Sequence, residues 1–524
     1  MGKKLDIMTV CGPIKGEEDD TYARFLGIPY ATAERFGSPH PVRWTSTLDC
    51  TKFGKKAMQD FENTDMGNTL QGGAPQSREE FDENCLNLNV YVPLQKENSP
   101  TPKRALPVLF EVHGGAFQRG SNQAHTPAQI LKDHEFIYVS INYRLGVFGF
   151  LYLDELLTSQ PTLHTGNLGL QDILAALEWV YTNIGAFGGD PEKIIVLASS
   201  AGAKAIAALM CTPHFNHYTH QLILASGSTQ SIRDKQTANQ IAQEYMAVLH
   251  KTTEDWSLTP ADLKTLSADT LLEAQKLLCC NPGNTCMFGP VADGDLIPED
   301  WQDIARKGTL WEGRAMIGCS LHEEAFYKIL YPDFSAQASW IADELFGENS
   351  DKAQEEFNRL AAENEKALGR VLTETETADL WVRILTDYMY RTHSYRLAKR
   401  LAKKGSIVWQ YSVEFKPALH CFDQMLAFGI PTPDFFDNEA HMKKGLDLGE
   451  QIYDAFTCFI ETGSPVMDAS TWPALSDSSP SSSANSSSRD SGKPVQMVWD
   501  EQSFLRPIAE GEVLESIGEQ VFKI

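Results

Sequence analysis

The sequence predicts an α/β protein, in which helices cover the faces of a large, mostly parallel central sheet. Short apolar runs rich in β-branched residues, bounded by turn residues, alternate with longer segments of helical periodicity. The chain has 524 residues and 42% hydrophobic composition, which is enough to bury a large core. Length alone permits several domains. Large α/β enzymes often form one unit, so we expect a single domain over residues 1–524.

The expected strands are short and apolar, as buried parallel strands are. They are Val108–Val112, Phe136–Asn142, Ile194–Ser199, Leu222–Ser226, Ala315–Gly318 and Ile407–Tyr411. Helical periodicity predicts helices over Leu170–Ile184 and Ala203–Met210. Parallel neighbours need crossover connections of this kind, so the alternation supports the predicted sheet.

Two longer segments, 234–280 and 335–404, are helical and charged without strand signals. We expect them to be helical insertions that roof a pocket. Residues 476–492 read SDSSPSSSANSSSRDSG, a low-complexity run that cannot bury apolar surface. This run predicts a Ser-rich flexible loop within the domain.

The net charge of −25 argues against a nucleic-acid partner, because phosphate binding needs clustered Lys and Arg. The simplest interpretation is a solvated acidic surface, and steering of cationic substrates is the alternative. The first residues lack the apolar stretch of a signal peptide, and no run has eighteen consecutive apolar residues. We therefore expect a cytoplasmic protein without a membrane span. Oligomeric state is not readable from the sequence.

The ten cysteines show no CxxC pair and no spacing typical of metal ligands. Reduced, buried thiols are the simplest interpretation. The alternative is a small loop closed by Cys279 or Cys280 with Cys286. His214, His217 and His220 have no matching cysteine or carboxylate, so they indicate a polar connection rather than a zinc site.

The strongest chemical signal is a strand that runs into a small-residue turn and then a helix, with the sequence IIVLASSAGA over residues 194–203. This pattern predicts a nucleophile elbow with Ser200 as the nucleophile. Ala198 and Gly202 are small, as the close approach of strand and helix requires. By itself the A-x-S-x-G pattern also occurs by chance, and the strand–turn–helix context favours the functional interpretation.

A second signal is the loop His113-Gly114-Gly115-Ala116-Phe117, directly after a predicted strand. A serine that attacks an acyl carbonyl needs backbone N–H groups to bind the developing oxyanion. We expect the N–H groups of Gly115, Ala116 and Ala201 to form this oxyanion hole. A plain glycine turn is the alternative, and the elbow about eighty-five residues later argues against it.

The general base of such an enzyme is a histidine late in the chain, after the acid. His420 follows the strand Ile407–Tyr411 and is the first candidate. His393 and His441 are rivals, but neither follows a strand, where loops collect catalytic groups.

The acid is expected just after the strand that ends at Gly318, where Glu323 and Glu324 are adjacent. One of them should orient the imidazole and stabilise its protonated form. The other is expected to be a solvated neighbour.

These motifs resemble those of the type B carboxylesterase and lipase family, a cholinesterase-like group, over nearly the whole chain. The resemblance is carried by ordered matches to the family's opening, its second signature and the run that leads to its serine. They include FLGIPYA at 25–31, ENCLNLNV at 83–90, NYRLG at 142–146, GNLGLQD at 166–172 and NIGAFGGDP at 183–191.

The resemblance implies an α/β-hydrolase fold with helical insertions over the active site. The family's G-x-x-x-D-E pattern, counted from Gly318, implies Glu323 as the triad acid, with Glu324 as the alternative. Phe428-Gly429 follows His420 at the sequence spacing found in the family, which implies His420 as the base. In the family, the second and third small residues of the oxyanion loop donate their backbone N–H groups, which implies Gly115 and Ala116 rather than Gly114.

Two departures from the family pattern concern the active site. The usual G-E-S-A-G elbow reads Ala198-Ser199-Ser200-Ala201-Gly202, so the acidic residue beside the nucleophile is absent. The third loop glycine is Ala116, which narrows the floor of the acyl pocket and keeps its backbone donor.

Together the residues predict a serine carboxylic-ester hydrolase that forms an acyl-enzyme on Ser200, with His420 as base and Glu323 as orienting acid. The expected partner is a small ester, and the chemistry requires no metal or organic cofactor. One alternative is an acyltransferase with the same triad. Another is a non-catalytic, cholinesterase-like binding protein, although such relatives typically lack a triad residue.

Overall fold

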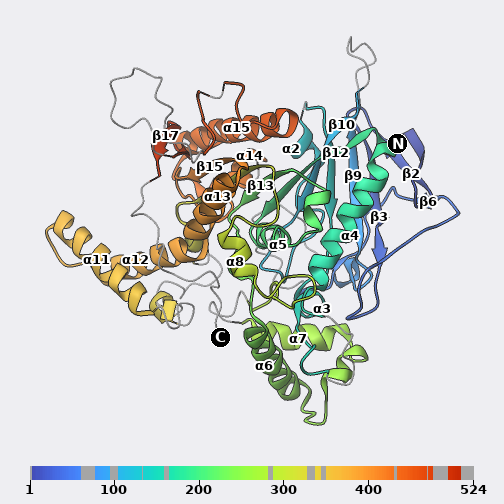
Figure 1. Cartoon of the computed structure of the whole chain (residues 1–524), viewed down its shortest axis with the longest axis horizontal. Helices are drawn as coiled ribbons and strands as arrows, with labels where there is room; N and C mark the ends of the chain where they lie inside the picture. Colours follow the sequence, from blue (N-terminus) through green and yellow to red (C-terminus); the bar gives the residue numbers. More distant parts are fainter. Residues whose placement is uncertain are drawn as a thin grey trace. The chain divides into compact units, whose positions relative to one another are not determined.

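The computed structural model describes the chain except residues 1–2, 61–76, 95–103, 133, 158–164, 281–286, 327, 329–336, 341, 344–349, 430–432, 469, 476–493 and 509–524 (Figure 1). Its contacts divide it into two compact units. The first comprises Met1–Gln221 and Ser231–Trp301, and the second comprises Leu222–Gln230 and Gln302–Lys523. The Ser-rich run 476–492 and Cys286 lie outside the described residues, and a single domain over 1–524 stays a prediction.

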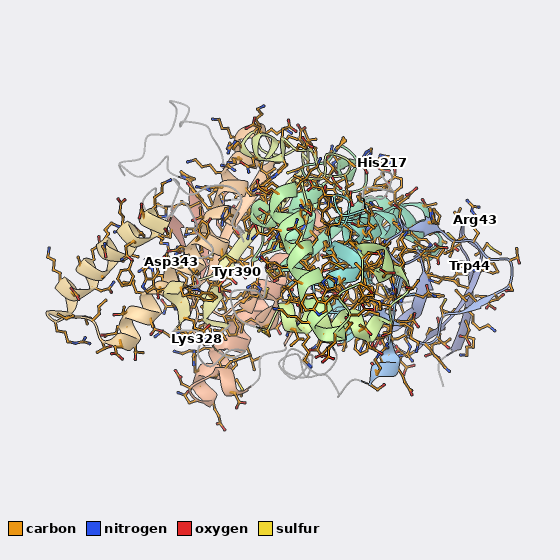
Figure 2. The ribbon with its side chains drawn as sticks, turned by 90° about the horizontal axis from the view of Figure 1, so that it is seen from below. Arg43, Trp44, His217, Lys328, Asp343 and Tyr390 are labelled. Atoms are coloured by element: carbon orange, nitrogen blue, oxygen red, sulfur yellow. The ribbon has the colours of Figure 1, made fainter. Side chains whose placement is uncertain are left out.

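The first unit holds an ordered set of strands that runs β1-β2-β3-β9-β11-β10-β12. Its antiparallel part comprises β1 (Lys3–Met8), β2 (Pro13–Glu18), β3 (Tyr22–Pro29) and β9 (Asn87–Pro93), and β9 pairs antiparallel with β11. Its parallel part comprises β10 (Leu106–Val112), β11 (Ile137–Ile141) and β12 (Gly189–Ser199). Trp44 (Figure 2) contacts the antiparallel part, because its indole N–H donates to the carbonyl oxygen of Pro13 in β2 at 2.8 Å.

The parallel strands are buried over their apolar stretches, because helices connect them and cover both faces. Each residue of β10 and β11 is buried, as is the apolar stretch of β12 from Ile194 to Ala198. The connecting helices are α2 (Pro127–Leu131), α3 (Gly146–Phe150), α4 (Leu168–Asn183) and α5 (Ala201–Leu209). The predicted strands in this region are confirmed to within a few residues at each end.

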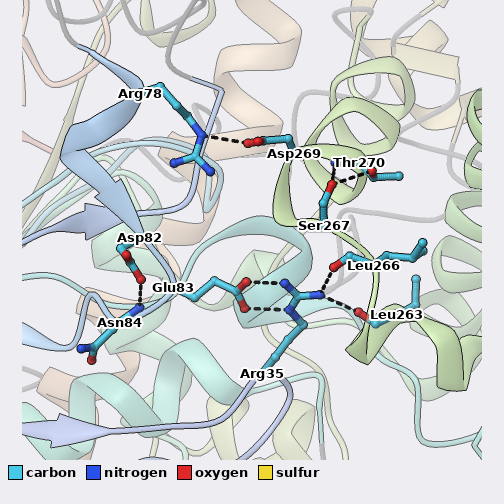
Figure 3. Close-up of polar contacts among 10 residues, drawn as sticks. All are labelled: Arg35, Arg78, Asp82, Glu83, Asn84, Leu263, Leu266, Ser267, Asp269 and Thr270. Atoms are coloured by element: carbon cyan, nitrogen blue, oxygen red, sulfur yellow. Dashed lines mark hydrogen bonds and ion pairs between the residues drawn. The ribbon is translucent and has the colours of Figure 1, made fainter.

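The helical segment at 234–280 contains α6 (Lys235–Thr253) and α7 (Ala268–Leu278). Arg35 joins the turn between them to the N-terminal part of the chain (Figure 3). Its guanidinium pairs with both carboxylate oxygens of Glu83 and donates to the carbonyl of Leu263 at 2.9 Å and to that of Leu266. Three segments distant in sequence thus meet at one partly buried arginine.

The second unit is built on β13 (Gln221–Ala225), β14 (Arg314–Ser320), β15 (Ile407–Val413), β16 (Val495–Trp499) and β17 (Phe504–Pro507). The pairs β14–β15 and β15–β16 are parallel, and β16–β17 is antiparallel. The backbone N–H of Ser226 donates to Gly318 O at 2.8 Å, which joins the end of β13 to β14. The loops that follow β13, β14 and β15 therefore lie together at the carboxyl ends of these strands.

Helices of the second unit include the expected helical insertion. They are α8 (Trp301–Arg306), α11 (Ser350–Leu368), α12 (Glu374–Thr386), a π-helix (Asp387–Arg391), α13 (Thr392–Lys404), α14 (Phe422–Ala427) and α15 (Glu439–Thr462). Helices α11 and α12 lie side by side, with the Phe357 and Trp381 rings stacked at 4.6 Å (Figure 1). The helical character predicted for 335–404 is confirmed where the structure describes it.

The remaining elements are short. They are β4 (Ala31–Thr32), β5 (His40–Pro41), β6 (Leu48–Asp49), β7 (Lys56–Ala57), β8 (Phe81–Asp82) and 3-10 helices at Arg78–Glu80, Ile184–Phe187, Phe215–His217, Thr229–Ser231, Pro260–Lys264, Glu323–Phe326 and Pro433–Phe435. Within the described part of the chain, no helix is both long and apolar enough to cross a membrane.

Candidate active site

Ser200 lies in the one-residue turn between β12 and α5. Its backbone has φ 51° and ψ −122°, a region that residues with a side chain rarely adopt. Such strain persists only where the surrounding structure enforces it, and it is common at nucleophile elbows. The side chain is partly exposed, whereas Ala198 and Ala201 are buried. The predicted strand, sharp turn and helix are therefore all present around Ser200.

Gly202 is the small residue that the elbow needs on its helix side. A Cβ atom at this position would lie 2.3 Å from the carbonyl oxygen of Val112, at the end of the neighbouring strand β10. Backbone atoms in a strand cannot retreat from such a contact without moving the strand. Glycine at 202 thus follows from the close approach of α5 to β10.

The glycine loop after β10 lies against this elbow. A Cβ atom on Gly114 would be 2.9 Å from both Ser199 O and the Ser200 Cβ atom. The next residues turn through positive φ, with 109° at Gly115, 53° at Ala116 and 59° at Phe117. The loop closes on itself, because the N–H groups of two following residues both donate to Gly115 O at 3.0 Å. The structure therefore brings the predicted oxyanion loop next to the predicted nucleophile.

His113 holds the start of this loop. Its ring stacks on Tyr143 at 4.5 Å, and the Tyr143 hydroxyl donates to the His113 carbonyl at 2.9 Å. Burial lowers the pKa of His113 to about 4, so the imidazole is neutral near pH 7. Its Nδ1 lies 2.8 Å from Gly114 O, and the neutral tautomer with hydrogen on Nδ1 donates there. This histidine fixes a loop carbonyl rather than moving a proton.

The acid and the histidine are positioned by two parallel strands. Glu323 begins the short 3-10 helix after β14, and His420 lies in the loop after β15. His420 Nδ1 forms a hydrogen bond with Glu323 Oε2. Glu323 is fully buried and His420 is 8% exposed. A backbone hydrogen bond also joins the two loops. The His322 N–H donates to Ala418 O at 2.9 Å.

The second oxygen of Glu323 is also occupied. Oε1 accepts hydrogen bonds from the Ser226 hydroxyl and from the Ser320 backbone N–H, each at 2.6 Å. Ser226 is fully buried, with φ 55°, directly after β13. The sequence pattern marks Ser226 only as the end of a predicted strand. Its signal was a small polar residue at the carboxyl end of a parallel strand, where functional groups collect.

Asp423 forms a second buried acid near this pair, which sequence reasoning also missed. Its Oδ2 accepts from the Tyr411 hydroxyl at 2.6 Å, and its Oδ1 accepts from the Gln424 N–H at 2.9 Å. Burial raises its pKa to about 6, with a further contribution from the charge of Glu323. The available signal was its place three residues after His420, at the start of α14.

Tyr390 lies on the π-helix (Figure 2). Its ring packs against that of His420, with ring centroids 5.0 Å apart. π-Helices are rare and occur frequently at functional sites. The rival histidines are placed differently. His393 is buried in α13, and His441 lies in the first turn of α15 with its Nδ1 3.5 Å from Asp437. Glu323 therefore pairs with His420 and not with a rival.

The prediction that the neighbour of the acid is solvated is wrong. Glu324 is only 5% exposed, because its short helix packs against α12. Its backbone N–H donates to the Thr386 hydroxyl at 3.1 Å. Two adjacent carboxylates predict one buried and one exposed side chain, but the packing of the helical insertion buries both Glu323 and Glu324.

The predicted site residues therefore form two groups. Ser200, Gly115, Ala116 and Ala201 belong to the first unit, whereas Glu323 and His420 belong to the second. In the described part of the chain, no cluster of three or more His, Cys, Asp or Glu side chains has the arrangement of a metal site.

Comparison with known proteins gives the same family throughout. The sequence model described as "Carboxylesterase family" matches residues 3–494. The para-nitrobenzyl esterase of Bacillus subtilis (strain 168) is 29% identical over 498 residues, covering 89% of this chain and 92% of that protein. Esterase cest-33 of Caenorhabditis elegans is 26% identical over 508 residues, covering 89% and 87%.

Solved structures agree with this result. The carboxylesterase EST55 of Geobacillus stearothermophilus, solved at pH 6.2, superposes with a TM-score of 0.77 at 25% identity, covering 97% of this chain and 98% of that one. A thermophilic PNB esterase superposes with a TM-score of 0.74 at 26% identity, over the same shares of the two chains.

Proposed function

Because this chain belongs to the carboxylesterase family and has its α/β-hydrolase fold, we propose that it hydrolyses carboxylic esters through an acyl-enzyme on Ser200. The observation that carries the assignment is the hydrogen bond between His420 Nδ1 and the buried Glu323 carboxylate. A buried acid that holds Nδ1 leaves Nε2 of the ring as the proton acceptor. The strained backbone of Ser200 supports it as the matching nucleophile.

In the first half-reaction, His420 Nε2 takes the Ser200 proton as Oγ attacks the ester carbonyl carbon. The carbonyl oxygen becomes an oxyanion, which the N–H groups of Gly115, Ala116 and Ala201 bind. The protonated imidazole then gives its proton to the departing alcohol as the tetrahedral intermediate collapses. The alcohol leaves and the acyl group stays on Ser200 Oγ.

In the second half-reaction, water replaces the alcohol. His420 takes a proton from the water as its oxygen attacks the acyl carbonyl, and the same donors bind the oxyanion. Collapse returns the proton to Ser200 Oγ and releases the acid. Glu323 stabilises the imidazolium in both halves and keeps its carboxylate charge.

The Ser226 hydroxyl and the Ser320 N–H hold the Glu323 carboxylate in place. Hydrogen bonds to a carboxylate favour its charged state, and here two donors point at one oxygen at 2.6 Å. These two hydrogen bonds hold Oε1 in place and leave Oε2 for the His420 Nδ1. Because Glu323 is fully buried, water does not take the place of these donors.

The proposal is tested with a fluorophosphonate probe that reacts with activated serines, followed by intact-mass analysis. Ser199→Ala is the matched control for Ser200→Ala, because the two serines are adjacent. We expect one adduct on the native protein and on Ser199→Ala, and none on Ser200→Ala, with turnover of p-nitrophenyl acetate and butyrate following the same pattern. A folded native protein without an adduct would overturn the proposal. Added alcohols, with product analysis, separate hydrolysis from acyl transfer.

A further inference from the structure

Gln59 is a buried amide that the proposed mechanism does not use. It lies two residues after β7, in the first unit, and is 2% exposed. Its side chain binds the backbone of Gly120 twice, because the Gly120 N–H donates to Oε1 at 3.0 Å and Nε2 donates to Gly120 O at 2.9 Å. Nε2 also donates to Ala57 O at 3.0 Å. One side chain therefore holds both backbone polar groups of Gly120.

Gly120 lies at the end of the oxyanion loop and packs against the start of the same loop. Its φ is 112°, and a Cβ atom there would be 2.3 Å from His113 Nδ1 and 2.7 Å from Gly114 O. These two atoms form the 2.8 Å hydrogen bond that holds the start of the loop. Gly120 therefore covers this hydrogen bond, and Gln59 keeps Gly120 there.

The Gly114 carbonyl sets the direction of one proposed oxyanion donor. A peptide unit is planar and trans, so the Gly114 C=O and the Gly115 N–H lie in one plane and point in opposite directions. A contact that fixes Gly114 O therefore also fixes the Gly115 N–H. The next peptide unit is held in the same way, because the N–H groups of Gln118 and Arg119 both donate to Gly115 O at 3.0 Å, which fixes the Ala116 N–H.

The loop needs such contacts because its backbone is strained. Gly115, Ala116 and Phe117 all have positive φ, and two of these residues carry side chains. A backbone of this kind keeps its conformation only where the surrounding structure holds it. Gln59 supplies a contact from outside the loop, 61 positions before Gly120.

We propose that Gln59 is a positioning residue for ester hydrolysis. By holding Gly120 over the hydrogen bond between His113 and Gly114, it keeps the Gly115 N–H directed at the oxyanion. The inference rests on the proposed function and adds a residue outside both the triad and the oxyanion loop. Because the oxyanion forms only after Ser200 attacks, Gln59 should affect the transition state more than substrate binding.

Gln59→Met removes the amide and keeps the length of the side chain. We expect kcat for p-nitrophenyl butyrate to fall about tenfold with little change in KM. This is less than the loss of about 10²–10³-fold that follows removal of an oxyanion donor, because the donor is misdirected and not removed. Rates are expressed per active site, counted by labelling Ser200 to completion with the fluorophosphonate probe, so that unfolded protein does not contribute.

A trifluoromethyl ketone distinguishes positioning from a structural role. Ser200 Oγ adds to its carbonyl carbon, His420 takes the serine proton, and the resulting hemiketal oxyanion needs the same N–H donors as the reaction. In Gln59→Met, the inhibition constant of 1,1,1-trifluoro-2-hexanone should rise by about the factor by which kcat/KM falls. A loss of stability alone would leave this constant unchanged.

Asn183→Leu is the matched control, because Asn183 is another buried amide of the first unit that binds backbone groups. It is 2% exposed, its Oδ1 accepts from Val10 N at 2.8 Å, and its Nδ2 donates to Trp179 O at 2.8 Å. Its replacement should lower stability and leave both kcat per active site and the inhibition constant as in the native protein.

Gly120→Ala tests the same contact from the side of the loop. The added Cβ would displace the His113 ring from Gly114 O. Gly188→Ala is its control, because Gly188 also has a positive φ, of 85°, and nothing lies within 4 Å of its Cβ position. Both variants strain the backbone, but only Gly120→Ala should lower kcat per active site and weaken binding of the ketone.

The inference is overturned if folded Gln59→Met keeps the native kcat per active site and the native inhibition constant, or if Asn183→Leu changes both as much. If Gln59→Met does not fold, Gly120→Ala decides by the same two measurements against Gly188→Ala. Failure of the proposed function looks different, because the native protein would then hydrolyse no ester and take up no probe at Ser200.

Discussion

The Ser226 hydroxyl donates a 2.6 Å hydrogen bond to the same Glu323 carboxylate that holds His420 Nδ1. The acid is thus shared between a serine at the end of one strand and a histidine after another. Since both bonds are buried, the orientation of the imidazole depends on Ser226 as well as on Glu323. Ser226 is therefore a positioning residue in the proposed mechanism.

Ser226→Ala removes one of two donors to Glu323 Oε1. We expect kcat to fall about tenfold with little change in KM, because a hydrogen bond to a charged group contributes about 1.5–3 kcal/mol, and part of that is recovered by the Ser320 N–H. Steady-state kinetics on p-nitrophenyl butyrate measure this. Ser228→Ala is the matched control, because the Ser228 hydroxyl donates to the His393 carbonyl instead. Equal losses in both variants would argue against a specific role of Ser226.

Gly202→Ala should destabilise the first unit. The added Cβ would lie 2.3 Å from Val112 O, so α5 and β10 must separate, at a cost of about 1–3 kcal/mol. Gly185→Ala is the control, since nothing lies within 4 Å of its Cβ position. Urea unfolding measures both. A Gly202→Ala variant as stable as the native protein would show that the elbow is not packed as tightly as described.

Asp423 should make stability depend on pH. Its pKa is raised from 3.8 to about 6 in the folded protein, so the folded state holds a proton that the unfolded chain releases. The free energy of unfolding therefore falls as pH rises through that window, by about 3 kcal/mol from this group.

Asp423→Asn removes this dependence. Relative to the native protein, the variant should gain stability between about pH 4 and about pH 6, and the difference should be constant above that range. Chemical denaturation at several pH values measures the difference. A difference that does not change with pH would contradict the raised pKa.

Tyr143→Phe tests the hold on the oxyanion loop. Loss of the hydroxyl leaves the buried His113 carbonyl without that donor, which should cost about 1–3 kcal/mol of stability and lower kcat. Tyr181→Phe is the control, because the exposed Tyr181 hydroxyl donates to Glu192 at the surface. Thermal unfolding together with turnover distinguishes the two. A loss of stability without any change in kcat would separate the tyrosine from the loop's function.

The sequence predicted the strands and the elbow because their signals are local. An apolar β-branched run predicts β12, and small residues on both sides of Ser200 predict the turn. His420 was separated from its rivals by following a strand, and the resemblance to the family assigned Glu323. These assignments rest on patterns within short windows or on a known family spacing.

Residues that depend on tertiary packing were not predictable in this way. Ser226 and Glu323 are 97 positions apart, and a single chain contains no signal that joins them. Glu324 was expected in solvent, because nothing in its own segment shows that α12 packs over it. The hydrogen bonds between Gln59 and Gly120 depend in the same way on two segments that meet only in the fold.

The central claim is an acyl-enzyme on Ser200, and trapping that intermediate tests it most directly. The protein is mixed with p-nitrophenyl butyrate, quenched in acid during turnover and digested with trypsin, which cuts after Lys193 and Lys204. We predict one butyryl group on the peptide Ile194–Lys204, located to Ser200 by fragmentation and absent in Ser200→Ala. Release of nitrophenol with no butyryl group on the protein, or with the group on another residue, would contradict the account.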